Sequence, residues 1–213
     1  MDSITLDISP FIELTNEQFY QLCQYHSDYR FERTASGALI VMSPTGGETS
    51  KRNADVVFQL QAWNKQTKLG VAFDSSGGFK LPNGAIRSSD TSWLKKERWN
   101  TLTPEQHQKF PPLCPDFVVE LCSPSDSLGE TQEKMQEYMD NKARLGWLID
   151  SQNQGTGFLA GDAMNPWLCE ELMDGDRAIA VSHRWRGLTS QSPMRSCPVM
   201  NQALNIQGPL QAF

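Results

Sequence analysis

The stretch Phe117-Val118-Val119-Glu120-Leu121-Cys122 is a nearly continuous apolar run, interrupted only by Glu120. A run of this length and composition is typical of a strand that is covered on both faces. Helical periodicity follows from Ser127 to about Arg144, and a second apolar run covers Leu145 to Ile149. Together these patterns predict a strand-helix-strand unit and therefore an α/β fold with helices packed against a sheet.

Earlier in the chain, short β-prone runs alternate with turn signals. Residues 30–34 and 38–43 flank Ala35-Ser36-Gly37, and residues 79–82 and 85–87 flank Asn83-Gly84, so each pair is a predicted hairpin. Apolar residues recur at helical spacing over residues 16–25, and again from about Val56 until Gly70. The N-terminal half therefore adds helices and hairpins to the unit around Glu120.

Length and composition limit the classes of protein to consider. A chain of 213 residues suits one ordinary domain. The net charge of -6 supplies no overall electrostatic attraction for nucleic acid, so any polyanion has to be bound through local contacts. Residues 1–10 lack the basic and apolar regions of a signal peptide, and no apolar run is long enough to cross a bilayer. We expect a soluble cytoplasmic protein with reduced cysteines and no membrane association.

Glu120 is the most informative polar residue of the chain. A strand of period two places Asp116, Val118 and Glu120 on one face, so the Glu120 carboxylate is expected to be at least partly buried. A buried carboxylate normally has a cation, a hydrogen-bonding cluster or a metal beside it. Asp90 can supply a second carboxylate from a neighbouring strand, and two such oxygen donors suit Mg²⁺ or Mn²⁺.

Two further residues complete the predicted site. Lys134 lies one turn before Tyr138 at the border of the helix's apolar stripe, so its long stem can bring the ammonium toward the carboxylates. A cation there can orient the attacking water and stabilise charge on phosphorus. Glu32, from the first hairpin, is expected to be an outer carboxylate. The candidate catalytic set is therefore Asp90, Glu120, Lys134 and Glu32, with Asp90 and Glu120 as metal ligands.

Each of these residues also has an ordinary structural interpretation. Asp90 can cap a loop, Lys134 can pair with Glu130 or Glu137 on a solvated helix face, and Glu32 can be an exposed strand residue. Such networks of ion pairs imitate catalytic clusters. Spacing alone therefore leaves both interpretations open.

Several ordered motifs resemble the Uma-two endonuclease-like family, a branch of the restriction-endonuclease-like PD-(D/E)XK superfamily. The resemblance covers about residues 10–154. The motifs are Phe31-Glu32 before a glycine hairpin, Val41-Met42-Ser43-Pro44-Thr45-Gly46-Gly47-Glu48, Phe79-Lys80-Leu81-Pro82-Asn83-Gly84, Pro115-Asp116-Phe117-Val118-Val119-Glu120-Leu121, and Lys134-Met135-Gln136-Glu137-Tyr138 leading to Leu145-Gly146-Trp147-Leu148-Ile149-Asp150.

The resemblance implies a mixed β-sheet flanked by helices and a metal-dependent DNA endonuclease. It also implies that a divalent metal, Mg²⁺ or Mn²⁺, is held by Asp90 and Glu120. The superfamily lysine usually follows the glutamate by two residues, where this chain has Cys122, so Lys134 is expected to take that role. Ser89 stands where proline is expected before the aspartate.

The end of the chain departs from the family pattern. Residues 155–213 show neither structural period, and we expect a divergent tail that follows a domain of residues 1–154 and has weak order. Our hypothesis is that a reading-frame change or a divergent replacement produced it. Alternatives to the nuclease are a degenerate nuclease fold that acts as a binding module, and a non-functional product with an altered C-terminus. The oligomeric state is open, with a homodimer as one expectation.

Overall fold

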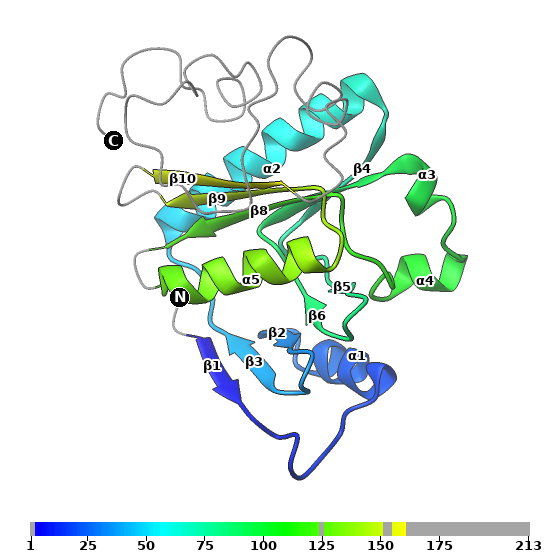
Figure 1. Ribbon diagram of the computed structural model, residues 1–213, viewed down its shortest axis with the longest axis vertical. Helices are drawn as coiled ribbons and strands as arrows, with labels where there is room; N and C mark the ends of the chain where they lie inside the picture. The colour runs from blue at the N-terminus through cyan, green and yellow to red at the C-terminus, as the bar shows by residue number, and fades with distance from the viewer. Residues whose placement is uncertain (1–2, 124–125, 151–154, 161–213) are drawn as a thin grey trace.

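The strands form two five-stranded sheets (Figure 1). The computed structural model describes residues 3–123, 126–150 and 155–160. The sheet with the longer strands, called the larger sheet, has the order β10-β9-β8-β7-β4. The sheet with the shorter strands, called the smaller sheet, has the order β1-β3-β2-β6-β5. This arrangement confirms the predicted fold class, a mixed α/β fold flanked by helices, and divides the strands between two sheets.

The larger sheet is built around β8 (Phe117–Cys122). Its neighbour β9 (Leu145–Asp150) runs parallel to it, because helix α5 (Leu128–Asp140) connects the two strands in a crossover. The other three strands of this sheet pair antiparallel. Strand β7 (Thr91–Lys95) pairs with β8, β4 (Gly70–Asp74) pairs with β7, and β10 (Gly155–Ala160) pairs with β9.

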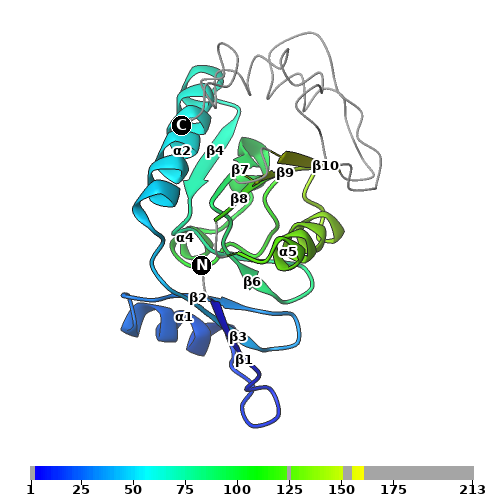
Figure 2. The same cartoon turned by 90° about the vertical axis from the view of Figure 1, so that its left-hand side faces the viewer.

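Helices cover both faces of this sheet, as Figures 1 and 2 show. Val56 of α2 (Gly47–Thr67) packs against Phe117, Val119 and other apolar residues on one face. On the other face, Met135 and other residues of α5 pack against Val118 and Cys122. The strand is therefore buried on both sides, as its apolar run predicts. In the part of the chain that the structure describes, no helix combines the length and apolar composition needed to span a membrane.

The smaller sheet is wholly antiparallel and includes both predicted hairpins. Its strands are β1 (Ser3–Leu6), β2 (Arg30–Arg33), β3 (Leu39–Met42), β5 (Phe79–Lys80) and β6 (Ile86–Arg87). Gly37 and Gly84 have φ values of 95° and 92° in the two turns, a conformation that glycine adopts without strain. Helix α1 (Asn16–Tyr25) buries Phe19 in the core cluster that contains Leu39 and Ile86. Two short helices, α3 (Lys96–Trp99) and α4 (Pro104–Gln108), follow β7.

Two helix boundaries and one strand differ from the sequence predictions. Helix α2 begins at Gly47, about nine residues earlier than its apolar periodicity indicates. Helix α5 ends at Asp140 rather than near Arg144, and Lys142 then adopts a φ of 79°, which turns the chain into β9. The sequence predicted no element after Gln154, but β10 pairs with β9 along six residues. The sheet therefore extends past residue 154, and the rest of the predicted tail lies outside the described residues.

Candidate active site

Strand β8 brings Glu120 to the face of the sheet that α5 covers. Period two places Glu120 on the same side as Val118 and Cys122, whose neighbours include Met135 of α5. The residue is only 7 % exposed. The register between β7 and β8 pairs Thr91 with Val119, so one step further Asp90 lies at the level of Glu120. The two carboxylates thus come from neighbouring segments at the centre of the larger sheet.

Asp90 is held in place by two donors. The backbone N–H of Leu121 donates to Oδ2 at 2.8 Å, and the Asn53 side-chain amide of α2 donates to Oδ1 at 3.0 Å. Burial raises the pKa of Asp90, and the Leu121 hydrogen bond and the charge of Lys134 oppose that rise. Asp90 is therefore a fixed, partly buried carboxylate, and the loop-capping interpretation from sequence does not describe its contacts.

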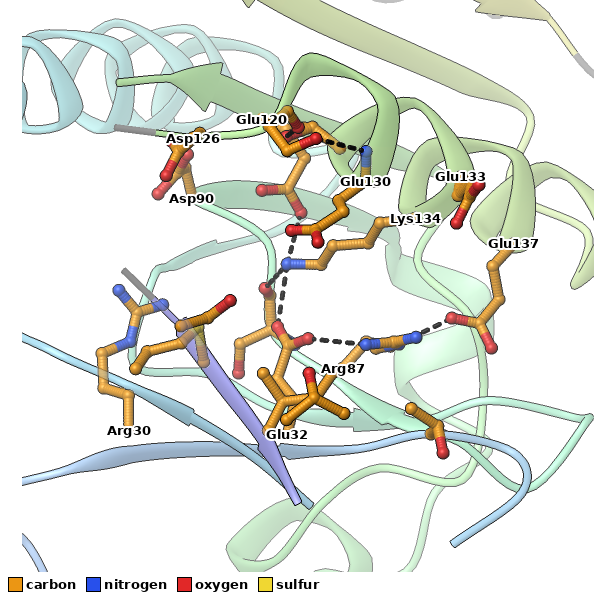
Figure 3. A pocket seen from close by; sticks show the side chains of 18 of the residues that line it. Arg30, Glu32, Arg87, Asp90, Glu120, Asp126, Glu130, Glu133, Lys134 and Glu137 are labelled. Carbon is orange, nitrogen blue, oxygen red and sulfur yellow. Dashed lines mark hydrogen bonds and ion pairs between the residues drawn. The ribbon is translucent and has the colours of Figure 1, made fainter. Parts of the chain in front are cut away.

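The Lys134 side chain extends from α5 toward Glu120 and Glu32 (Figure 3). Its Nζ lies 2.8 Å from Glu32 Oε1 and 2.9 Å from Glu120 Oε1, and it donates to the Ser88 carbonyl oxygen at 2.7 Å. The contact with Glu120 is a close ion pair between an ammonium and a buried carboxylate oxygen. The structure thus brings Lys134 to both carboxylates, and not to Glu130 or Glu137.

The expected role of Glu32 as an outer carboxylate stays a prediction. Its side chain is buried, with the residue only 2 % exposed, so the alternative of an exposed strand residue is wrong. Besides Lys134, it accepts from the backbone N–H of Ser88 at 3.0 Å and pairs with Arg87 Nη1 at 3.0 Å. Arg87 Nε in turn pairs with Glu137 of α5 at 2.6 Å. The pairing of β2 with β6 brings these groups together, so Glu32 links the smaller sheet to the lysine.

Three residues that position this cluster lie outside the set predicted from the sequence: Asn53, Arg87 and Ser88. Arg87 lies in a predicted strand shortly before Asp90, and a charged residue there is the one signal that could have marked it. Asn53 gives no such signal, because it is one of many polar residues in α2. Backbone groups such as those of Ser88 carry no sequence signal at all.

Burial and charge shift the pKa values of Glu120, Glu32 and Lys134 in ways that differ between the three groups. Burial raises the pKa of Glu120 to about 8, although Lys134 opposes the rise, and the charges of Asp90 and Glu32 add to it. Burial also acts to raise the pKa of Glu32, but Lys134 and Arg87 outweigh it and hold this pKa below its usual value. The carboxylates together raise the pKa of Lys134 against the effect of burial. The lysine is therefore charged at neutral pH.

These shifts predict how stability depends on pH. Since the folded protein binds the Glu120 proton more tightly than the unfolded chain does, this residue lowers the free energy of unfolding as pH rises from 4.5 to about 8. The raised pKa of Asp90 also lowers the free energy of unfolding as pH rises. The lowered pKa of Glu32 contributes stability that is lost only below the usual pKa of a glutamate, and the raised pKa of Lys134 contributes stability that is lost only at strongly alkaline pH. We expect urea unfolding at about pH 5 and about pH 8.5 to show a smaller loss of stability in Glu120→Gln than in the parent. An equal loss in both proteins would contradict the raised pKa of Glu120.

The donor set fits a hard divalent cation better than zinc. Among the residues described, no group of three or more His, Cys, Asp or Glu side chains is arranged to hold a metal ion. Mg²⁺, however, usually binds one or two carboxylates and keeps several waters. Glu120 Oε1 is a buried oxygen whose neighbour is the Lys134 ammonium at 2.9 Å, and Asn53 Oδ1 is a buried oxygen without a hydrogen-bond partner among the described residues. Both oxygens belong to residues beside Asp90. Asp90 and Glu120 therefore fit Mg²⁺ or Mn²⁺.

An open cleft of about 1120 Å³ leads to these groups. Residues of β2 and β3 in the smaller sheet line one side, and residues of α5 line the other. Asp90, Glu120, Lys134 and Glu32 all line it, so the four residues selected from sequence share one solvent-accessible space. A substrate can approach them from this side.

The fold and this cluster define an α/β protein of the restriction-endonuclease-like class. Comparison with protein families matches residues 16–156 to Uma2, described as "Putative restriction endonuclease". The chain belongs to the Uma2 family, and this membership supports a nuclease function. A similar solved structure is that of a "putative nuclease belonging to DUF820" from Anabaena variabilis ATCC 29413, with a TM-score of 0.56 and 18 % identity over 70 % of this chain and 80 % of that chain. That likeness supports the fold. No curated protein matches the chain.

Proposed function

We propose that the protein is a metal-dependent DNA endonuclease with its active site at Asp90, Glu120, Lys134 and Glu32. The observation that supports this most is the position of one partly buried lysine between two buried glutamates, with Asp90 next to Glu120. A purely structural ion-pair network has no need to open onto a large cleft, whereas these residues line one. Membership of the Uma2 family supports the same reaction class.

In this proposal each residue has a separate role. Asp90 and Glu120 hold Mg²⁺ or Mn²⁺, and Leu121 N–H and Asn53 keep Asp90 oriented. The metal would polarise a phosphate oxygen and lower the pKa of a bound water. Lys134 places a positive charge beside the phosphorus, where negative charge develops during hydrolysis.

Glu32 acts through Lys134 rather than on the substrate. Its Oε1 atom contacts the ammonium at 2.8 Å, and Arg87 fixes its other oxygen at 3.0 Å. Two oriented carboxylates confine the lysine, so its charge needs little rearrangement when substrate binds. Glu32 is therefore a positioning residue in this proposal.

Binding of the metal should raise the melting temperature. A ligand that binds only the folded state stabilises it by about 1.4 kcal/mol at ten times its Kd, which corresponds to a shift of a few degrees for a chain of this size. The shift should be larger above about pH 8 than near pH 6, because a ligand carboxylate has to lose its proton. Thermal melting with Mg²⁺ or Mn²⁺, and with Asp90→Asn as the control that shows no shift, tests this. No shift in the parent at saturating metal would favour a degenerate nuclease fold.

A further inference from the structure

The two walls of the cleft differ in charge. The wall formed by the smaller sheet and the start of α2 presents hydroxyl groups, those of Ser3, Thr5, Thr34, Thr45 and Thr49. The wall formed by α5 presents Glu130, Glu133 and Asp140, which are exposed. These three carboxylates form no ion pair with the described residues. One wall can therefore accept phosphates through hydrogen bonds, and the other repels them.

Arg30 is the cation on the hydroxyl wall. The other two cations that line the described cleft, Arg87 and Lys134, are each bound to two carboxylates. Arg30 forms no ion pair with a described carboxylate and donates to the Ser75 carbonyl oxygen at 2.5 Å. A guanidinium has five N–H donors, so most of them are available to a ligand.

The position of Arg30 suits a phosphate next to the reacting one. It begins β2 and lines the same cleft as Asp90. Figure 3 shows its guanidinium on the Asp90 side of the cleft, away from the α5 carboxylates. Arginine binds phosphate oxygens through paired hydrogen bonds. Such a pair increases the affinity for a nucleic-acid strand and also sets the position of its backbone.

We infer that the cleft takes a single strand of DNA, whose backbone follows the hydroxyl wall with one phosphate on Arg30, and that the α5 wall disfavours a duplex. This inference rests on the proposed function, since it names the substrate of the same site. A duplex carries a second row of phosphates, and repulsion by Glu130, Glu133 and Asp140 acts on that row. Because these carboxylates are exposed, the discrimination weakens as salt rises.

Binding assays separate this inference from catalysis. Fluorescence anisotropy of a labelled oligonucleotide, alone or annealed to its complement, is measured with Ca²⁺, which shares the charge of Mg²⁺ and its preference for oxygen ligands. We expect tighter binding of the single strand. Arg30→Gln should weaken that binding about tenfold, Arg30→Lys should recover part of the loss, and Lys65→Gln, an equal charge change at an exposed residue outside the cleft lining, should leave it unchanged.

A second variant tests the acidic wall. Glu130→Gln, Glu133→Gln and Asp140→Asn together should raise duplex affinity several-fold at low salt and less at high salt. Three results would overturn the inference. The parent could bind the duplex as tightly as the single strand or more tightly, or it could bind neither oligonucleotide. The third result is an Arg30→Gln variant that melts like the parent and binds the single strand equally well. Metal-dependent cleavage without a strand preference would overturn it and leave the proposed function intact. Preferential binding of the single strand without any cleavage would contradict the proposed nuclease function and leave the strand preference of the cleft intact.

Discussion

Glu120→Gln is expected to lower metal-dependent DNA cleavage by about a thousandfold or more, because the variant loses an anionic metal ligand and with it several kcal/mol of transition-state stabilisation. Glutamine has nearly the same shape, so the packing of the α5-facing core around this position should persist. The measurement is single-turnover cleavage with Mg²⁺ or Mn²⁺. Glu97→Gln makes the same chemical change at an exposed residue of α3 and should cleave like the parent.

Stability separates loss of the metal from loss of the fold in this experiment. In the absence of metal, Glu120→Gln should melt at or above the parent's temperature at alkaline pH, because the variant no longer buries an ionised carboxylate. A variant that retains the fold but not cleavage supports the ligand role. Cleavage at the parent's rate would show that Glu120 is a structural partner of Lys134 and nothing more.

The second large effect is expected from Lys134→Ala. Cleavage should fall by about a hundredfold or more, comparable to the loss of one oriented electrostatic group, while metal binding persists. The variant also leaves Glu32 and Glu120 buried without the ammonium, a change that typically costs about 3–5 kcal/mol of stability. Urea unfolding and cleavage at a temperature where the variant is folded measure the two effects separately.

Lysine in a second position gives the sharper version of this test. Cys122 lies two residues after Glu120 and on the same face of β8, where it is buried in the α5-facing core cluster. Cys122→Lys in the Lys134→Ala background should recover part of the cleavage, since the new ammonium points toward the same carboxylates. If Lys134→Ala alone cleaves as fast as the parent, the lysine is an ion-pair residue without a catalytic role.

Periodicity predicted most of what positions Glu120. The apolar run of β8 and the helical spacing of α5 are local patterns, so they indicate which face Glu120 and Lys134 share before any tertiary contact is known. The two hairpins follow from their glycine turns for the same reason. Boundaries were less accurate, because Gly47 and its polar neighbours extend α2 without an apolar signal.

The burial of Glu32 could not be predicted in this way. It depends on the single pairing of Arg33 with Ile86, which joins β2 to β6 across more than 50 residues and sets Arg87 against Glu32. No local pattern encodes that contact. The same holds for Asn53, whose amide meets Asp90 only after α2 has packed on the sheet.

Anomalous diffraction from crystals soaked in Mn²⁺ tests the central claim most directly. The account predicts one strong anomalous peak between Asp90 and Glu120, with carboxylate oxygens of both residues at about 2.0–2.2 Å and with waters in the remaining positions. Lys134 should stay within reach of Glu32. A soaked crystal with no peak there at saturating Mn²⁺, and with Lys134 still paired to Glu120, would contradict the account and leave the cluster as a structural ion-pair network.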